Sequence, residues 1–368
     1  MDNDIVNLAT PGVRGLTPYV PGKPVEELER ELGVTHAIKL ASNENPLGPS
    51  PKALAAARKA LPEVARYPDG GGFALKRALA ARLKVEPGQI TLGNGSSDVI
   101  EFAARIFVAP GDEVVFSQHA FAMYPILTQA IGGRAVEVPA RDWGHDLEAM
   151  GRAVTAKTRL TFLTNPNNPT GTWFDRASLM RFLRAIPPQV IVVLDEAYFE
   201  YADHLEYPDG LTLLGEFPNL IVARTFSKVY GLAGLRVGYS VSSTTIADLL
   251  NRIRPPFNVN SLAMVAAEAA LADDDHLRRT VRLNHDGMRQ LTDGFRKLGL
   301  SHIPSAGNFV CVEVGDAACV NDALLRQGVI VRPIANYGMP RHLRVTVGLP
   351  EENERFLKAL GKVLRREC

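Results

Sequence analysis

The chain has 368 residues and a formal net charge of +1, and 46% of its residues are hydrophobic, so it has no strongly basic field for nucleic acid but can bury a large core in more than one domain. No apolar run reaches the length of a membrane span and the opening residues lack a signal-peptide pattern, so we expect a cytoplasmic protein with no membrane partner. The three cysteines show no zinc-type spacing, and we predict no metal site.

The chain opens with a stretch rich in proline and glycine, residues 11–24, which we expect to form an arm packed near the C-terminal lobe. From residue 90 onward, short apolar runs alternate with amphipathic segments. Strands are predicted at 90–94, 113–117, 134–138, 159–163, 190–194, 220–225 and 236–241. Helices are predicted at 97–108, 122–131, 146–154 and 175–185. This alternation predicts an α/β fold in which a mainly parallel seven-stranded sheet lies between helices.

A glycine-rich turn follows the first predicted strand. Its sequence is Gly93-Asn94-Gly95-Ser96-Ser97-Asp98, and a helical pattern begins directly after it. Glycines let the backbone approach a ligand, and the free N–H groups of a helix N-terminus attract anions. Asp98 stands where a dinucleotide-binding fingerprint has its third glycine, so the turn is either an ordinary helix cap or a phosphate-binding loop.

Polar side chains follow three of the later strands. The fourth predicted strand runs into a proline-rich loop that contains Asn168, the fifth ends at Asp195, and the sixth leads to Lys228. Ligands of open α/β sheets bind at the carboxyl ends of the strands. We therefore expect an amide, a carboxylate and an amine to meet at one edge of the sheet.

Lys228 is a candidate Schiff-base lysine. Burial and the nearby cation Arg236 would both lower the pKa of its ammonium group and make the free amine available as a nucleophile. A solvated surface lysine is the ordinary alternative for a single Ser-Lys pair.

These motifs, in this order and spacing, resemble the fold-type I pyridoxal-phosphate aminotransferases. The matching residues are Asn168-Pro169-Thr170-Gly171, Asp195 with Tyr198, Ser227-Lys228 and Arg236. The resemblance implies that pyridoxal 5'-phosphate is the cofactor, that Lys228 forms the covalent link to its aldehyde, and that Asp195 pairs with the ring nitrogen.

The same resemblance implies the remaining cofactor contacts. Asn168 and Tyr198 would hydrogen-bond the phenolic oxygen of the ring. The residues that would hold the phosphate are Ser96, Ser97, Ser227 and Arg236. Tyr124 matches the aromatic residue that stacks on the pyridine ring, with a tyrosine of the hydrophobic core as the alternative.

The pattern changes after Arg254-Pro255-Pro256. A long helical stretch, roughly 262–298, is predicted to lead into an α+β lobe, with strands at 308–314 and 343–347 and helices at 316–326 and 351–365. We therefore divide the chain into three parts: an N-terminal arm with part of the small domain (1–40), a large cofactor-binding domain (41–260), and a linking helix with the C-terminal small domain (261–368).

Nearly the whole chain, from about residue 14 to 365, resembles the histidinol-phosphate aminotransferases. Stretches that carry this resemblance are 16–19, 40–48, 66–69, 331–332 and 343–348. In that family the tyrosine matching Tyr67 reaches the cofactor phosphate of the neighbouring subunit, which implies a homodimer with shared active sites. The arginine matching Arg344 binds the α-carboxylate of glutamate and 2-oxoglutarate. Tyr19 and Arg332 match positions that help to bind the substrate phosphate, and Asn43 is a further expected substrate contact.

The implied activity is a ping-pong transfer of an amino group between L-histidinol phosphate and 2-oxoglutarate, which gives imidazole acetol phosphate and L-glutamate, in histidine biosynthesis. Aromatic-amino-acid aminotransferases and threonine-phosphate decarboxylases share this scaffold and its motifs. A transcription regulator that senses pyridoxal phosphate would need a DNA-binding segment, and the residues before Ala41 contain no basic helix. No motif marks a pocket for the imidazole ring, so the ring specificity stays open.

Overall fold

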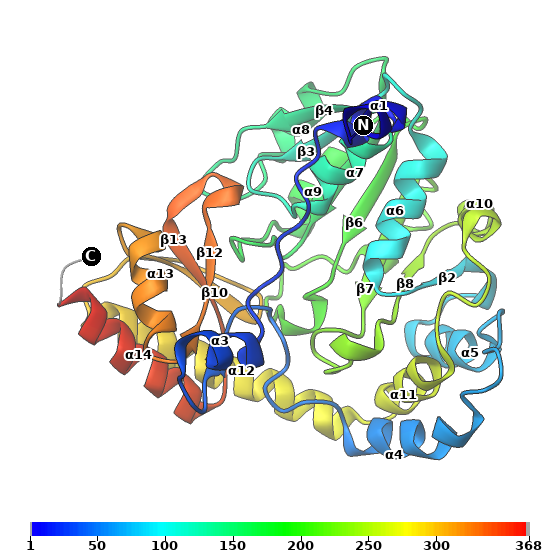
Figure 1. Cartoon of the computed structure of the whole chain (residues 1–368). Helices are drawn as coiled ribbons and strands as arrows, with labels where there is room; N and C mark the ends of the chain where they lie inside the picture. Colours follow the sequence, from blue (N-terminus) through cyan, green and yellow to red (C-terminus); the bar gives the residue numbers. More distant parts are fainter. Residues whose placement is uncertain (1, 366–368) are drawn as a thin grey trace.

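The computed structural model describes residues 2–365 (Figure 1). A seven-stranded sheet with the strand order β2-β8-β7-β6-β5-β3-β4 forms the centre of the larger lobe. Its strands are β2 (Ile90–Gly93), β3 (Glu113–Ser117), β4 (Arg134–Val138), β5 (Thr158–Thr164), β6 (Ile191–Asp195), β7 (Leu220–Thr225) and β8 (Gly238–Val241). The predicted α/β fold with a mainly parallel sheet is confirmed. Strand β8 alone runs antiparallel to both of its neighbours, β2 and β7.

Helices cover both faces of this sheet because the strand residues are apolar on both sides. On one face, α6 (Ser96–Phe107), α7 (Met123–Ala130) and α10 (Thr244–Ile253) bury a core that includes Phe116 and Phe162. On the other face, α8 (Leu147–Arg152) and α9 (Arg176–Ala185) pack on Val192 and Leu194. Each predicted helix of this region lies within a few residues of an observed one.

The smaller lobe is an α+β unit, as expected. Its antiparallel sheet has the order β12-β13-β10-β9, built from β9 (His302–Ile303), β10 (Phe309–Glu313), β12 (Arg332–Ile334) and β13 (Met339–Thr346). The helices of this lobe are α13 (Ala317–Leu325) and α14 (Pro350–Leu364). A two-residue strand β1 (Ile38–Lys39) pairs in parallel with β11 (Val329–Ile330), which ties the start of the chain to the C-terminal lobe. The predicted domain boundaries near residues 40 and 260 stay predictions.

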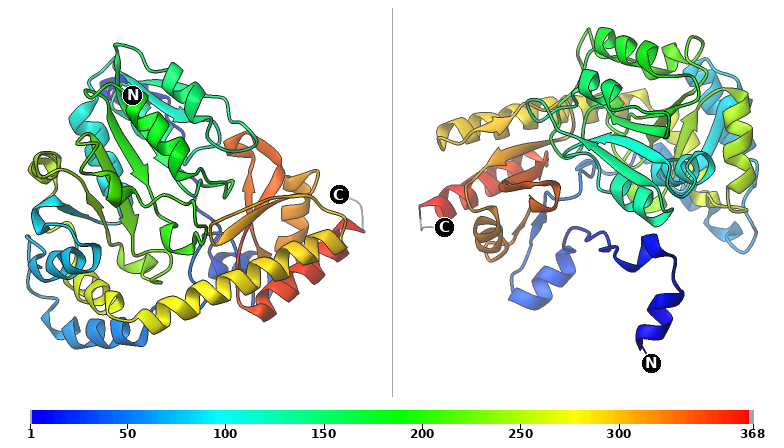
Figure 2. Two further views of the ribbon diagram at one scale, coloured as in Figure 1. Left: turned by 180° about the vertical axis from the view of Figure 1, so that it is seen from behind. Right: turned by 90° about the horizontal axis from the view of Figure 1, so that it is seen from above.

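The long helical stretch predicted over 262–298 is present, but it consists of two helices. Helix α11 (Ser261–Leu271) stops, and α12 (Asp274–Lys297) starts after Asp273, whose carboxylate accepts a hydrogen bond from the N–H of His276. Ser50 also donates a hydrogen bond to Asp273 at 2.7 Å. Helix α12 then runs from the large lobe to the small one (Figure 2).

The N-terminal segment contains the helices α1 (Asp2–Leu8), α2 (Pro11–Arg14) and α3 (Val25–Leu32), followed by α4 (Pro51–Ala60) and α5 (Phe73–Leu83). Gly12 approaches the end of α7 so closely that a Cβ atom there would lie 2.0 Å from the carbonyl oxygen of Gln129. Further along, the carbonyl of Val20 accepts a hydrogen bond from Arg332 in the small lobe. The arm therefore contacts both lobes rather than only the C-terminal one. None of the helices described here is long and apolar enough to cross a membrane.

Candidate active site

The predicted site residues gather where β5, β6 and β7 end. The strand register places Thr164 beside Asp195 and Asp195 beside Ala223, so the ends of all three strands lie at one edge of the sheet. Asn168 belongs to the loop after β5, and Lys228 belongs to the connection between β7 and β8. The strand order thus brings an amide, a carboxylate and an amine to this edge, which is the arrangement that we expected.

Lys228 points its amine into this edge. Its Nζ atom donates a hydrogen bond to the carbonyl of Ser42 at 3.2 Å and lies 5.7 Å from the centre of the Tyr198 ring. Burial, and then the positive charge of Arg344, lower the pKa of the lysine to about 8. On the order of a tenth of the amine is therefore unprotonated at pH 7, which is far more than for a solvated lysine.

Asp195 is buried at the end of β6 with an exposed fraction of 4%. One carboxylate oxygen accepts a hydrogen bond from the N–H of Ala197 at 3.2 Å, and the other accepts one from the hydroxyl of Tyr124 at 3.1 Å. Burial raises the pKa of this carboxyl group to about 6. Within residues 2–365 no arginine or lysine forms an ion pair with it. A buried acid in such surroundings is suited to a cationic ligand atom.

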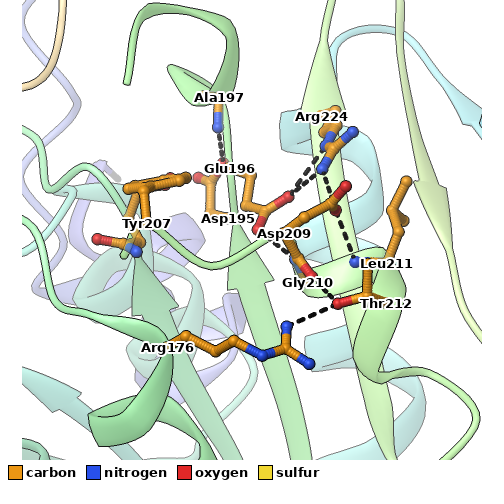
Figure 3. Close-up of polar contacts among 11 residues, drawn as sticks. Arg176, Asp195, Glu196, Ala197, Tyr207, Asp209, Gly210, Leu211, Thr212 and Arg224 are labelled. Carbon is orange, nitrogen blue, oxygen red and sulfur yellow. Dashed lines mark hydrogen bonds and ion pairs between the residues drawn. The ribbon is translucent and has the colours of Figure 1, made fainter. Parts of the chain in front are cut away.

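The next residue, Glu196, belongs to a separate ionic cluster that no sequence motif indicated (Figure 3). Its carboxylate accepts two hydrogen bonds from Arg224 of β7, at 2.9 and 2.7 Å, and one from the N–H of Gly210 at 2.9 Å. The same guanidinium group also bonds Asp209 at 2.8 Å and lies 3.6 Å from the centre of the Phe199 ring. This cluster holds the backbone that follows Asp195 against the neighbouring strand β7.

Tyr198 and Asn43 form a pair. The amide of Asn43 donates a hydrogen bond to the hydroxyl of Tyr198 at 2.9 Å, and both side chains are buried. The backbone N–H of Asn43 donates to Thr346 of β13 at 2.9 Å. Asn43, which we expected to contact substrate, thus connects Tyr198 with the small lobe.

Arg344 joins the small lobe to the loop of Asn168. Its guanidinium group donates one hydrogen bond to the side-chain oxygen of Asn168 and a second to the carbonyl of Ala41, at 2.8 Å. The Nε atom is buried and has no hydrogen-bond partner among the described residues. A buried donor without a partner is costly, and a bound anion such as a carboxylate would satisfy it.

Arg236 and the glycine-rich turn form an anion cradle. The guanidinium group donates to the hydroxyl of Ser227 at 3.2 Å. Gly95 passes so close that a Cβ atom there would lie 2.3 Å from a guanidinium nitrogen of Arg236. Helix α6 begins immediately afterwards with Ser96 and Ser97, and its first N–H groups face outward from the helix end. A cation, hydroxyls and a helix N-terminus together suit a phosphate group.

Tyr19 and Arg332 also lie together. The guanidinium carbon of Arg332 lies 5.6 Å from the centre of the Tyr19 ring, and both residues line a cleft of about 980 Å³. The walls of the cleft come from the arm, the end of β3 and strand β12. Among the described residues that form these walls, Lys228 and Asp195 are absent. The two residues expected to bind the substrate phosphate therefore lie together, in a cleft that reaches the end of β3.

Tyr67 lies at the surface. Its side chain is 82% exposed and stacks on the ring of Phe257 with 4.6 Å between the ring centres. Val64 and Phe73, close by in sequence, are also exposed apolar residues.

Tyr124 does not fit the stacking role that the sequence predicted. Its side chain is 0% exposed, and its ring stacks on Phe162 in the core, with 4.4 Å between the ring centres. A residue that stacks on a bound ring would need a face open to the site. The half-buried Phe121 meets Tyr124 edge-on at 5.8 Å and was not recognised from the sequence, although it lies only three residues earlier.

Comparisons with known proteins agree on one family. Residues 35–360 match the family described as aminotransferase class I and II. Histidinol-phosphate aminotransferase 2 of Pseudomonas fluorescens is 62% identical over 369 residues, and the match covers 100% of both chains. The crystal structure of histidinol-phosphate aminotransferase from Sinorhizobium meliloti in complex with pyridoxal-5'-phosphate has a TM-score of 0.90 at 34% identity and covers 98% of each chain. An aspartate aminotransferase of Thermus thermophilus, with a TM-score of 0.81 and 22% identity, shares the fold.

Proposed function

Because the chain belongs to the histidinol-phosphate aminotransferases, within the class I and II aminotransferases, we propose that it interconverts L-histidinol phosphate plus 2-oxoglutarate and imidazole acetol phosphate plus L-glutamate, in histidine biosynthesis. The observation that carries this proposal is the full-length match at 62% identity. The meeting of Lys228, Asp195 and Arg236 around one sheet edge supplies the chemistry that such a reaction needs.

The residues present fit pyridoxal 5'-phosphate as the cofactor. When bound, this group supplies an aldehyde and an electron-withdrawing ring that stabilises negative charge on the substrate α-carbon. The amine of Lys228 would bind the aldehyde carbon, and the carboxylate of Asp195 would hold the proton of the ring nitrogen. The cradle of Arg236, Ser227 and the start of α6 would hold the phosphate.

Lys228 has a second task as the general base. Its Nζ atom would take the proton from the α-carbon of the amino donor in one half-reaction and would give a proton to the α-carbon of the amino acceptor in the other. A pKa of about 8 suits this work, because the amine is a competent base and is still partly unprotonated near neutral pH.

The two arginines would divide the substrates between them. Arg344, whose Nε atom has no hydrogen-bond partner in the part of the chain that the structure describes, would bind the α-carboxylate of glutamate, with Asn168 beside it. Arg332 and Tyr19 would bind the phosphate of histidinol phosphate from the neighbouring cleft. Phe121, which is only half-buried, would offer its ring to the face of the cofactor in place of Tyr124.

We further propose a homodimer in the cytoplasm, in which Tyr67 reaches the cofactor phosphate of the partner. The 82% exposure of Tyr67 supports this, because an isolated subunit gives its hydroxyl no buried role. The exposed side chains of Val64, Phe73 and Phe257 around it would become buried in such an interface.

A screen of half-reactions tests the proposed substrates. Protein loaded with pyridoxal phosphate is mixed with histidinol phosphate, glutamate, phenylalanine, tyrosine or threonine phosphate, and the absorbance of the bound cofactor is followed. We expect histidinol phosphate and glutamate to react fastest. A faster reaction with phenylalanine would instead indicate an aromatic-amino-acid aminotransferase, and carbon dioxide released from threonine phosphate would indicate a decarboxylase.

A further inference from the structure

Two hydroxyl groups form a buried chain that ends on Asp195. The hydroxyls of Thr164 and Tyr124 lie 2.6 Å apart, and the hydroxyl of Tyr124 lies 3.1 Å from a carboxylate oxygen of Asp195. The exposed fractions of the three side chains are 1%, 0% and 4%. Water therefore has no access to this chain, and its members must satisfy one another.

The chemistry of the groups fixes the direction of the hydrogen bonds. An ionised carboxylate can only accept, so Tyr124 must donate its single hydroxyl proton to Asp195. The tyrosine oxygen is then free to accept, and Thr164 donates to it. Both protons point toward the carboxylate, and each bond polarises the next.

The direction of these hydrogen bonds favours the ionised form of Asp195. Within residues 2–365, the other oxygen of Asp195 accepts a hydrogen bond only from the N–H of Ala197, at 3.2 Å. Without the tyrosine hydroxyl, one oxygen of a buried carboxylate would lose its hydrogen-bond donor, and the uncharged acid would be favoured. An uncharged acid cannot stabilise the positive charge of a protonated pyridine nitrogen.

We propose that Tyr124, and through it Thr164, are positioning residues that keep Asp195 ionised and aimed at the ring nitrogen of the cofactor. The inference rests on the proposed function, since it requires that pyridoxal phosphate binds beside Asp195. It gives Tyr124 a part in the reaction that depends on its hydroxyl, whereas its ring packs on Phe162.

The substitution Tyr124→Phe separates these two contributions, because phenylalanine keeps the ring that packs on Phe162 and lacks only the hydroxyl. The affinity of the apoprotein is measured for pyridoxal phosphate and for the deaza analogue, in which a carbon replaces the ring nitrogen. The covalent link through Lys228 is common to both ligands, so the ratio of the two affinities reports the ring nitrogen alone. We expect this ratio to fall by about tenfold or more in the variant, as for loss of a hydrogen bond to a charged group. We also expect kcat to fall while the KM for glutamate changes by less than about twofold.

Two further variants sharpen the test. Thr164→Val should lower the affinity ratio in the same direction but less, and it should add nothing in the Tyr124→Phe background, because Thr164 acts only through the tyrosine. The matched control is Tyr201→Phe, since Tyr201 is also a buried tyrosine but its hydroxyl does not bond Asp195, whose carboxylate accepts from Tyr124 and Ala197. The control should leave the ratio unchanged.

The outcomes separate this inference from the proposed function. If the wild-type protein prefers pyridoxal phosphate to the analogue and both Tyr124→Phe and Thr164→Val keep that preference, the positioning role is overturned and the aminotransferase stands. If the wild-type protein shows no preference, the role of Asp195 fails and the positioning role fails with it. If Tyr124→Phe does not fold, an unchanged ratio in Thr164→Val still decides against the inference.

Discussion

At the residue scale, burial acts on Lys228 and Asp195 in opposite directions and thereby brings their pKa values close together. It lowers the pKa of the lysine to about 8 and raises that of the aspartic acid to about 6. In both cases burial disfavours the charged form. The site therefore holds an amine that is ready to react and a carboxylate that needs a positive partner.

The lysine shift predicts how capture of the cofactor depends on pH. Because the pKa of Lys228 is lowered to about 8, its amine loses its proton as the pH rises through 8. Raising the pH from 7 to 9 should speed the covalent capture of pyridoxal phosphate by the apoprotein by about tenfold. Stopped-flow absorbance measures the rate, and Lys228→Ala is the control that shows no covalent capture. A midpoint near 10.5, the ordinary lysine value, would contradict the burial of the amine.

The two arginines predict different losses for the two substrates. Arg344→Ala should weaken the half-reaction with glutamate most, because glutamate loses the partner of its α-carboxylate. Arg332→Ala should weaken the half-reaction with histidinol phosphate most and leave glutamate less affected. Each loss should be on the order of 2–4 kcal/mol, or roughly thirty- to a thousandfold in kcat/KM. Equal losses for both substrates in each variant would show that the arginines only hold the lobe in place.

At the element scale, the pair of Glu196 and Arg224 holds the end of β6 against β7. Their side chains are 0% and 4% exposed. Arg224→Met should lower the free energy of unfolding by about 3–5 kcal/mol, because it leaves a buried carboxylate without its cation. Denaturant unfolding of the apoprotein measures this.

Two variants control this experiment. Adding Glu196→Gln to Arg224→Met should recover part of the loss, because the unpaired charge is removed. Arg184→Met, which breaks a surface pair with Glu216, should change the stability by less than about 1 kcal/mol. A similar loss from both arginine variants would mean that burial of the pair adds nothing.

Some features of these elements could be predicted from the sequence, and others could not. Strand ends and glycine turns are local signals, so the positions of Asp195 and Lys228 followed from the residues around them. The direction of β8 did not, because an apolar run has the same pattern in parallel and antiparallel pairs. The break before α12 has a local signal, the cap that Asp273 forms with the N–H of His276, but the bond from Ser50 to Asp273 joins distant parts of the chain and has no signal in the spacing. The environment of Tyr124 likewise depends on Phe162 and Thr164, which no spacing in the sequence brings near it.

At the scale of the whole molecule, a shared active site predicts complementation between inactive variants. Lys228→Ala and Tyr67→Ala should each impair the homodimer. In a mixed dimer, the subunit that keeps Lys228 receives an intact Tyr67 from its partner, so one normal site is restored. Mixing and reassembly should yield about a quarter of the wild-type activity, since half of randomly formed dimers are mixed and each holds one intact site. Activity that stays at the level of the separate variants would argue against Tyr67 acting across an interface.

The contacts between the chain ends bear on how the protein folds. Arg344 bonds the carbonyl of Ala41, and Thr346 bonds the N–H of Asn43, in each case across 303 residues of sequence. Contacts this distant form slowly, since the intervening chain must first be ordered. The phosphate cradle needs only residues of the large lobe, between Gly95 and Arg236. A folding intermediate with an ordered large lobe could therefore bind the cofactor phosphate before it could bind a substrate carboxylate, and the cofactor would act as a template for the last folding step.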